Sequence, residues 1–267
     1  MESFKTSRRE MAVAARFWIG TSGWHYAHWR GVFYPEGLPT SRWLAHYVQH
    51  FPTVEINNSF YRQPKASAWQ LWRRSAPDGF RFAVKANRYL THVKRLQGVE
   101  ESVGRFLEGA RLLEDRLGPV LYQMPPAFHR TPENERRLAA FLKMLPKGMQ
   151  HVFEFRHASW LCDDCLALLR LYAAGFCAFD MVDLECPLAA TAPFAYVRFH
   201  GSETLYASNY TDEMLAGWAA LLRGLAEGLT DVYIYFNNDA WGYAVSNART
   251  LAEMLGGDPR GAEPSVR

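Results

Sequence analysis

The segment FAYVRFH at residues 194–200 and the similar segment DVYIYFN at residues 231–237 decide the fold. Each is a short apolar run, almost unbroken, that ends in polar side chains. Such runs are typical of parallel strands that are buried on both faces of a sheet. Six more segments share this pattern: Phe17–Thr21, Thr53–Asn57, Phe80–Lys85, Pro119–Gln123, Gln150–Phe155 and Gly175–Asp180.

Helix-like segments separate most of these runs. Leu138, Phe141, Leu142 and Leu145 recur at helical spacing, and Thr131 before a proline is a typical helix start. Residues 181–193 are rich in proline and alanine and have no helical pattern. The sequence therefore predicts a TIM-like (β/α)8 barrel, of the α/β class, in which one βα unit is degenerate. The expected helices are Ser41–Phe51, Lys65–Ser75, Gly98–Leu117, Pro132–Leu145, Trp160–Ala174, Asp212–Leu229 and Tyr243–Leu255.

The length of 267 residues suits one such barrel, which we place at residues 17–255 between flexible tails at 1–16 and 256–267. A net charge of +3 argues against broad electrostatic binding of nucleic acid, although a local basic site stays open. Cysteines are few, and we see no apolar segment long enough for a signal peptide or a membrane span. We therefore expect a cytoplasmic protein without a membrane partner. The sequence leaves the oligomeric state open.

In a TIM barrel the carboxyl ends of the strands carry the active site. After the first strand comes GTSGW at residues 20–24, where two glycines let the backbone approach a ligand. Ser22, Trp24 and Tyr26 are candidate ligand-binding residues, and the two rings are suited to stack on a sugar or a base. The alternative is that the glycines form a turn and the rings close the mouth of the barrel.

The second strand ends in VEINNSFY at residues 54–61. Because strand residues alternate between faces, Glu55 and Asn57 share one face, and we expect it to be the barrel interior. Tyr61 closes this stretch as a further candidate for substrate binding. An ion pair between Glu55 and Lys85, at the end of the third strand, is the structural alternative.

By the same alternation, Glu154 shares a face with Arg156, and Arg198 shares one with His200. Two guanidinium groups are suited to clamp a phosphate or carboxylate. His200 is a candidate acid or base because an ordinary histidine titrates near neutral pH. A purely structural network of ion pairs is the alternative.

Amides and a carboxylate follow the fourth and eighth strands. Asn237, Asn238 and Asp239 lie in a glycine-containing loop, and Gln123 ends the fourth strand. These groups suit a ligand rich in hydroxyls, whereas turn capping alone would also explain Asn238 and Asp239.

A divalent metal is possible but not favoured. The candidate ligands come from different strands, and nearby basic residues such as Lys85, Arg156 and Arg198 would already neutralise the acids. The candidate ligands are Glu55, Glu154, Asp180, His200 and Asp239. The sequence leaves the identity of any cofactor unknown.

Seven segments together resemble the YecE-like family, a family of unknown function catalogued as domain-of-unknown-function family 72. They span nearly all of residues 19–255. The resemblance implies a TIM-barrel-like fold with a polar mouth and a loose relation to sugar isomerases, and it implies no established reaction. The loop that carries Trp241 and the segment after Asp180 depart from the family pattern. The matching strings are GTSGW with FYP, VEINNSFY, FAVKANRYLTH, LGPVLYQMPP, FEFRHASW, YVRFHG, and YFNND followed by Asn247 and Ala248.

Our leading hypothesis is an enzyme that acts on a small anionic, hydroxyl-rich metabolite, such as a sugar phosphate, by isomerase, epimerase or lyase chemistry. Arg156 and Arg198 would clamp the anion. The base would be Glu55 or Glu154, and His200 or Lys85 would act as acid or electrophile. Trp24 and Tyr26 would stack on the ligand, and hydroxyls would be bound by Asn57, Gln123, Asn237 and Asp239.

Two alternatives come from other functional classes. One is a protein that binds or processes nucleic acid or nucleotides by aromatic stacking and a local basic patch. That patch would consist of Lys85, Arg88, His92, Lys94 and Arg95. The other is a binding protein without turnover.

Overall fold

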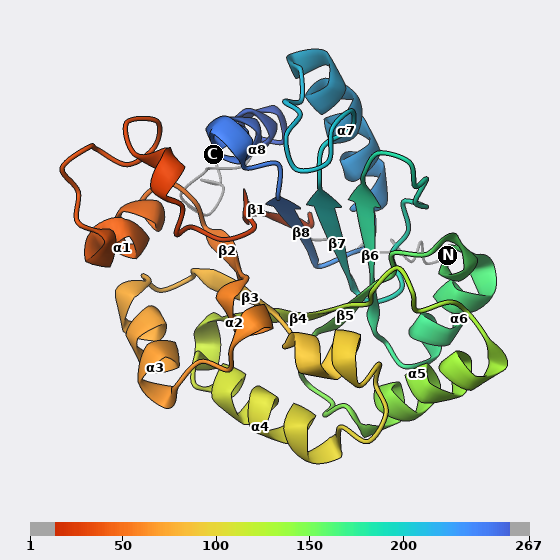
Figure 1. Ribbon diagram of the computed structural model, residues 1–267. Coiled ribbons are helices and arrows are strands. Elements are labelled where there is room, and N and C mark those ends of the chain that lie inside the picture. The colour runs from red at the N-terminus through yellow and green to blue at the C-terminus, as the bar shows by residue number, and fades with distance from the viewer. Residues whose placement is uncertain (1–13, 257–267) are drawn as a thin grey trace, which may run out of the picture.

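The computed structural model describes residues 14–256, and within them one parallel sheet of eight strands curls into a barrel (Figure 1). The strand order is β1-β8-β7-β6-β5-β4-β3-β2. The predicted strands are all present, with ends that shift by one or two residues. The tails predicted at 1–16 and 256–267 lie outside the described residues, except for residues 14–16 and 256. The strands are β1 (Arg16–Thr21), β2 (Thr53–Ile56), β3 (Arg81–Lys85), β4 (Leu117–Gln123), β5 (His151–Glu154), β6 (Gly175–Asp180), β7 (Phe194–Phe199) and β8 (Asp231–Phe236).

Helices surround the barrel (Figure 1). At the start of α5, the Thr131 hydroxyl accepts a hydrogen bond from the Asn134 amide, as expected of an N-cap residue before proline. No helix forms between β6 and β7, so the degenerate unit is confirmed. The α-helices are α1 (Trp43–Tyr47), α2 (Asn58–Tyr61), α3 (Ala66–Ser75), α4 (Glu100–Arg111), α5 (Pro132–Met144), α6 (Asp163–Leu171), α7 (Asp212–Leu225) and α8 (Tyr243–Met254). The single-turn helices are η1 (Ala27–Trp29), η2 (Thr40–Arg42), η3 (Tyr89–Val93), η4 (Glu114–Arg116), η5 (Ala158–Trp160) and η6 (Ala240–Gly242), of which η3 is a π-helix.

The helix predicted at Gly98–Leu117 is shorter than expected. Helix α4 ends at Arg111, and Glu114 has a φ of +50°, which no α-helix continues through. Leu117 already belongs to β4. The prediction ran too far because apolar residues keep helical spacing beyond Arg111, where the backbone already turns back toward the barrel.

The barrel closes between β1 and β2 by an unusual seam. A backbone hydrogen bond of 2.8 Å runs from the Gly23 amide to the Glu55 carbonyl. Lower down, the Tyr47 hydroxyl lies between the strands: it accepts from the Thr21 amide at 2.9 Å and donates to the Thr53 carbonyl at 3.1 Å. A phenol thus replaces a strand-to-strand hydrogen bond.

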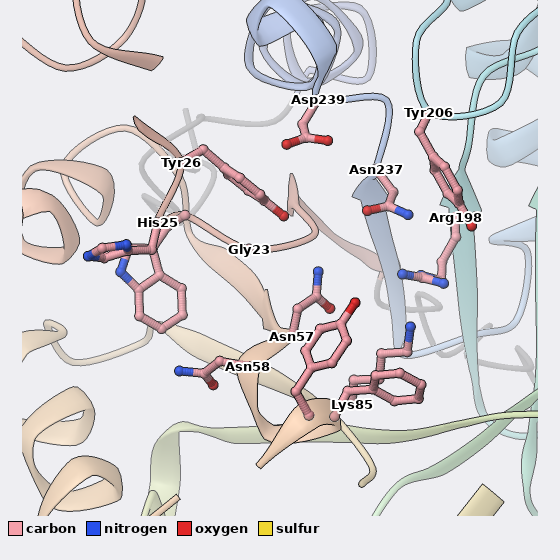
Figure 2. Close-up of a pocket in the computed structure, with 13 residues that line it drawn as sticks. Gly23, His25, Tyr26, Asn57, Asn58, Lys85, Arg198, Tyr206, Asn237 and Asp239 are labelled. Atoms are coloured by element: carbon pink, nitrogen blue, oxygen red, sulfur yellow. The ribbon is translucent and has the colours of Figure 1, made fainter. Parts of the chain in front are cut away.

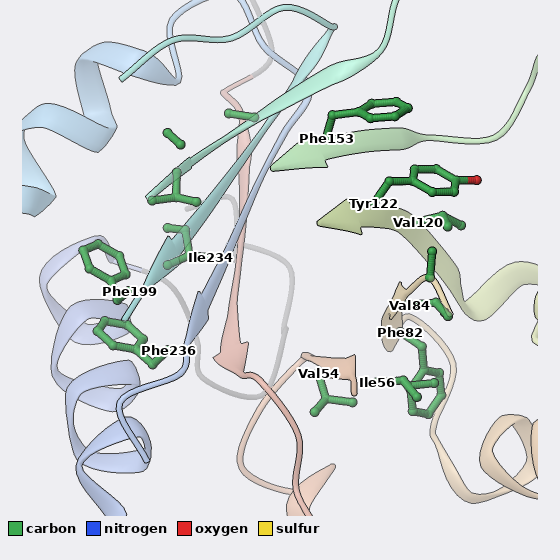
Figure 3. Close-up of a cluster of buried hydrophobic side chains, with 14 of the residues drawn as sticks. Val54, Ile56, Phe82, Val84, Val120, Tyr122, Phe153, Phe199, Ile234 and Phe236 are labelled. Carbon is green, nitrogen blue, oxygen red and sulfur yellow. The ribbon is translucent and has the colours of Figure 1, made fainter. Parts of the chain in front are cut away.

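Side chains that alternate along the strands form two cores. The larger one lies between the barrel and the helices, and Figure 3 shows Val54, Phe199 and Phe236 pointing outward into it. The smaller one fills the barrel interior with residues of opposite parity, including Trp18 and Tyr233. Because this interior core is apolar, the polar residues of the same parity gather at the carboxyl ends of the strands.

Candidate functional site

A cavity of about 520 Å³ opens at the carboxyl end of the barrel (Figure 2). Its walls come from the ends of β1, β2, β3, β7 and β8 and from the loops that follow them. This is the end at which TIM barrels carry their active sites, and the volume suits a small ligand. The lining residues are Gly23, Trp24, His25, Tyr26, Asn57, Asn58, Phe60, Tyr61, Lys85, Arg198, Tyr206, Asn237 and Asp239.

The guanidinium group of Arg198 joins two buried carboxylates beneath the cavity. Its Nη1 atom is 2.7 Å from Glu154 Oε2, and its Nη2 atom is 2.8 Å from Glu55 Oε1. The Tyr196 hydroxyl donates to the other Glu55 oxygen at 2.6 Å. Arg198 is fully buried, so these contacts form in a region of low dielectric, where an unpaired charge would be very unfavourable.

Glu154 also contacts a second arginine, Arg156, whose Nε atom donates to Glu154 Oε1. Burial opposes the ionisation of Glu154, but the charges of Arg156 and Arg198 outweigh it and hold its pKa well below the usual range. Both oxygens of this carboxylate are therefore occupied, and it stays ionised.

His200 lies beside these arginines. The Arg156 Nη2 atom is 2.8 Å from His200 Nε2, and the Asn237 amide is 3.1 Å from Nδ1. Burial and the charges of Arg156 and Arg198 hold the pKa of His200 well below its usual value. The imidazole is therefore neutral, and its Nε2 lone pair faces a guanidinium donor.

Ser22 links this network to the cavity wall. Its hydroxyl donates to Glu55 and accepts from Arg198 at 2.9 Å and from the Asn57 amide at 3.0 Å. The Tyr26 hydroxyl donates to the Ser22 carbonyl at 2.6 Å. Between them, Gly23 has a φ of +94°, and a Cβ there would lie 2.7 Å from the Tyr26 hydroxyl. A glycine is therefore needed for this loop to lie flat against the tyrosine.

Lys85 extends into the cavity from the end of β3 (Figure 2). Its backbone is held on two sides, since the Ser59 hydroxyl donates to the Lys85 carbonyl at 2.7 Å and Ala86 bonds to β4. Among residues 14–256, no carboxylate oxygen lies within 4.0 Å of its amine, which is instead 4.4 Å from the centre of the Phe60 ring. Burial, and then the positive charge of Arg198, lowers the pKa of Lys85 to about 8.

Asp239 lies across the cavity from Lys85 (Figure 2). Its carboxylate is 3.5 Å from the His28 Nε2 atom, which also contacts the Asp239 carbonyl at 2.8 Å. Burial raises the pKa of Asp239, although the nearby His28 offsets part of this effect. Asp239 is thus a carboxylate with a cavity-facing position and a raised proton affinity.

The structure brings together about half of the predicted site residues at the cavity. Those that line it are Trp24, Tyr26, Asn57, Tyr61, Lys85, Arg198, Asn237 and Asp239. A second group lies beneath the cavity in the ion-pair network: Ser22, Glu55, Glu154, Arg156 and His200. Gln123 and Asn238 do not line the cavity.

Two structural alternatives from the sequence match the observed contacts. The network of ion pairs within the barrel is present, although Glu55 pairs with Arg198 and not with Lys85. Asn238 is fully buried and donates to the Ser208 carbonyl and to Asn247 Oδ1, so it holds the loop after β7.

The sequence interpretation missed several lining residues: His25, Asn58, Phe60 and Tyr206. Tyr206 lies in the loop after β7 and has a φ of +64°. Its amide bonds to the His200 carbonyl at 2.5 Å, which folds the loop over the strand end. No periodic pattern in the sequence marks a loop residue such as Tyr206. Asn58 and Phe60, in contrast, belong to the segment VEINNSFY and could have been predicted as site residues from it.

Within residues 14–256, no group of three or more histidine, cysteine or acidic residues is arranged to hold a metal ion. None of the helices described is long and apolar enough to cross a membrane. The four cysteines are all free.

Known proteins resemble this chain over almost its whole length. The family described as "Protein of unknown function DUF72" matches residues 18–266. The UPF0759 protein YunF of Bacillus subtilis is 27% identical over 281 residues, which cover 92% of this chain and 97% of that protein. A crystal structure of a DUF72 family protein from Thermotoga maritima is 30% identical with a TM-score of 0.83, covering 90% of this chain and 99% of that one. Another, from Enterococcus faecalis, is 21% identical with a TM-score of 0.79, covering 90% and 95%. The chain belongs to the DUF72 family.

Proposed function

We propose that this protein is an enzyme that binds a small anionic, hydroxyl-rich substrate in the barrel cavity and transfers protons to and from it. The observation that carries the proposal is the amine of Lys85. It lines the cavity, and within the described residues it has no carboxylate partner within 4.0 Å. A half-buried ammonium without a counter-ion is unfavourable, so a ligand that supplies a negative charge is the natural partner.

The charges beneath the cavity support an anionic ligand. Glu55 and Glu154 balance Arg156 and Arg198, so this network has no net charge to offer Lys85. All three Arg156 nitrogens and both terminal nitrogens of Arg198 already bond to protein groups, and only the buried Arg198 Nε atom has no partner within the described residues. We therefore assign the anion to Lys85 and give the arginines the role of fixing the floor of the cavity.

Two groups on opposite sides of the cavity supply the acid/base chemistry. Asp239, whose pKa burial raises, removes a proton from a carbon next to a carbonyl group. Lys85, as an ammonium, stabilises the negative charge that then develops on the carbonyl oxygen. The amides of Asn57 and Asn237 bind hydroxyls, and Tyr26 and Trp24 pack against the ligand. Isomerases, epimerases and some lyases share this step.

Proton exchange in deuterium oxide tests this proposal without knowledge of the product. Sugar phosphates and hydroxy acids are incubated with the protein, and deuterium at the carbon next to the carbonyl is followed by NMR. We expect exchange with at least one compound and a loss of about 10²–10⁴-fold in Lys85→Met or Asp239→Asn. Lys143→Met, at an exposed lysine of α5, is the matched control and should exchange normally. Absence of exchange with the whole panel would refute acid/base chemistry.

Binding is measured separately by thermal shift. A ligand at about 100 times its dissociation constant stabilises the folded state by about 2.7 kcal/mol. Phosphorylated sugars should raise the melting temperature, and their neutral parent sugars should not. Stabilisation that persists in Lys85→Met would show that the anion binds elsewhere.

The alternative of nucleic-acid binding is favoured by one observation, the exposed rings of Tyr61, which lines the cavity, and of Trp241 in η6. Tyr61 is 75% exposed and Trp241 is 78% exposed, and the basic residues Arg88, Lys94 and Arg95 are exposed after β3. Oligonucleotides therefore belong in the same screen. Binding to them with a steep salt dependence, and no response to sugar phosphates, would favour this alternative. We also propose that the protein works in the cytoplasm, in keeping with its four free cysteines.

A further inference from the structure

Lys85 differs from the other lysines in its surroundings. The sequence has six lysines, and four of the others (Lys65, Lys94, Lys143 and Lys147) are exposed. Lys85 stands at the end of a barrel strand, and its backbone is fixed by the Ser59 hydroxyl. Its amine enters a cavity that has room for a small ligand. A side chain on a rigid strand end can hold a reacting atom in a defined position.

An amine attacks a carbonyl carbon only when it is unprotonated. With a pKa of about 8, roughly 9% of Lys85 is neutral at pH 7, against about 0.04% for a lysine of ordinary pKa. The surroundings explain this: no carboxylate within the described chain pairs with the amine, the Phe60 ring lies beside it, and after burial the positive charge of Arg198 has the largest effect on its pKa. Desolvation next to another cation is a known way to activate a lysine nucleophile.

The cavity also holds the groups that such a reaction needs. Asp239 lies on the opposite wall, where it can take up and return a proton (Figure 2). The amides of Asn57 and Asn237 also line the cavity, where they can bond the oxygen of an addition intermediate. Lys85 therefore shares the cavity with an acid/base group and neutral amides, which a covalent amine step can use.

We propose that Lys85 forms a Schiff base with the aldehyde or ketone carbonyl of a hydroxylated, anionic substrate. The inference rests on the proposed function and names its substrate class. The nitrogen lone pair forms the C–N bond, the C=O electron pair moves to oxygen, and a proton passes from nitrogen to that oxygen. The carbinolamine then takes up one proton and loses water, which leaves an iminium ion. The iminium keeps the positive charge that faces the substrate's anionic group. It also makes the neighbouring C–H bond more acidic, so that Asp239 can remove its proton.

Reductive trapping tests the covalent step on the wild-type protein. The probes are glyceraldehyde 3-phosphate and dihydroxyacetone phosphate, with sodium cyanoborohydride at pH 7, and glycerol 3-phosphate is the matched compound without a carbonyl. Trypsin cannot cleave after an alkylated lysine, so an adduct on Lys85 yields the peptide 82–88 in place of 82–85. We expect one adduct per chain, formed at least about tenfold faster than at Lys143, because of the larger neutral fraction at Lys85. Glycerol 3-phosphate should give none.

Variants separate this inference from the proposed function. Equal labelling of Lys85 and Lys143 would overturn the Schiff base. A second result would also overturn the Schiff base: no trapped adduct, with deuterium exchange lost in Lys85→Met but retained in Lys85→Arg. That result would leave the proposed acid/base chemistry in place. Failure of both exchange and trapping would overturn both proposals. Loss of exchange in Lys85→Arg together with selective trapping in the wild type is the result that the covalent step predicts.

Discussion

Replacing Arg198 by methionine should strongly destabilise the fold. The buried network contains Glu55, Glu154, Arg156 and Arg198, which together have no net charge, and the variant leaves one carboxylate uncompensated. Removing one partner of a buried ion pair typically costs about 3–5 kcal/mol. In a domain of this size, 1 kcal/mol corresponds to about 2–4 °C, so we expect the melting temperature to fall by about 6–20 °C.

The loss should depend on pH in a defined direction. In the wild type, Arg156 and Arg198 hold the pKa of Glu154 well below its unfolded value, so this group stabilises the fold above about pH 4 and loses that effect as acid protonates it. In Arg198→Met, a carboxylate deprived of its cation takes up a proton in the folded state that the unfolded chain releases. Stability then falls as pH rises. The difference between wild type and variant should therefore be larger at pH 8 than at pH 5.

Urea unfolding at pH 5 and pH 8 measures both effects. Arg170→Met, at an exposed arginine of α6, is the control and should change the free energy of unfolding by less than about 0.5 kcal/mol. The double variant Glu55→Gln with Arg198→Met restores charge balance and should recover part of the loss. A deficit below about 1 kcal/mol, or one that is equal at both pH values and unaffected by Glu55→Gln, would show that charge balance in the buried network does not stabilise the fold.

Three further variants test the other features of the barrel. Lys85→Met should stabilise the fold at pH 7 by removing an uncompensated ammonium, and this advantage should shrink from pH 8 to pH 10 as Lys85 loses its proton in the wild type; a loss of stability at pH 7 would make Lys85 a structural cation. Tyr47→Phe leaves two buried backbone groups at the β1–β2 seam without partners and should cost about 2–4 kcal/mol in urea unfolding, and a change below 0.5 kcal/mol would contradict that role. Gly20→Ala would bring a Cβ within 2.2 Å of the Thr53 carbonyl oxygen, so calorimetry should register a loss of about 1–3 kcal/mol, whereas Gly104→Ala in α4 has open space and should be neutral or stabilising.

The strands were predictable because parallel strands are buried on both faces and therefore read as continuous apolar runs. Alternation then fixed which polar residues enter the barrel. Glu55, Glu154 and Arg198 do share the interior, as their parity predicts. Parity does not specify partners, because these depend on the stagger of strands far apart in sequence. The pairing of Glu55 with Arg198, 143 residues away, is decided by barrel closure.

The loops at the cavity mouth were less predictable. Asn238 looks like a ligand-binding amide by sequence, yet it is buried and holds the loop after β7 through Ser208 and Asn247. Tyr206 reaches the cavity only because that loop folds back onto the carbonyl of His200. Positions of this kind follow from tertiary hydrogen bonds between separate loops, which leave no periodic signal in either segment.

The arrangement of charges makes Lys85 the informative residue of this site. Glu55 and Glu154 both belong to the same barrel interior, but both turn to Arg198, so neither forms an ion pair with the amine. Where stability alone matters, an apolar residue is often as good as a buried charge or better. An ammonium left without a partner at the end of a rigid strand, facing a cavity, therefore indicates a role in binding or chemistry. Lys85→Met consequently links the two kinds of experiment: if it stabilises the fold at pH 7 and abolishes exchange, the uncompensated charge is the cost of the activity. If it destabilises the fold and leaves exchange intact, Lys85 is part of the scaffold and the site must lie elsewhere.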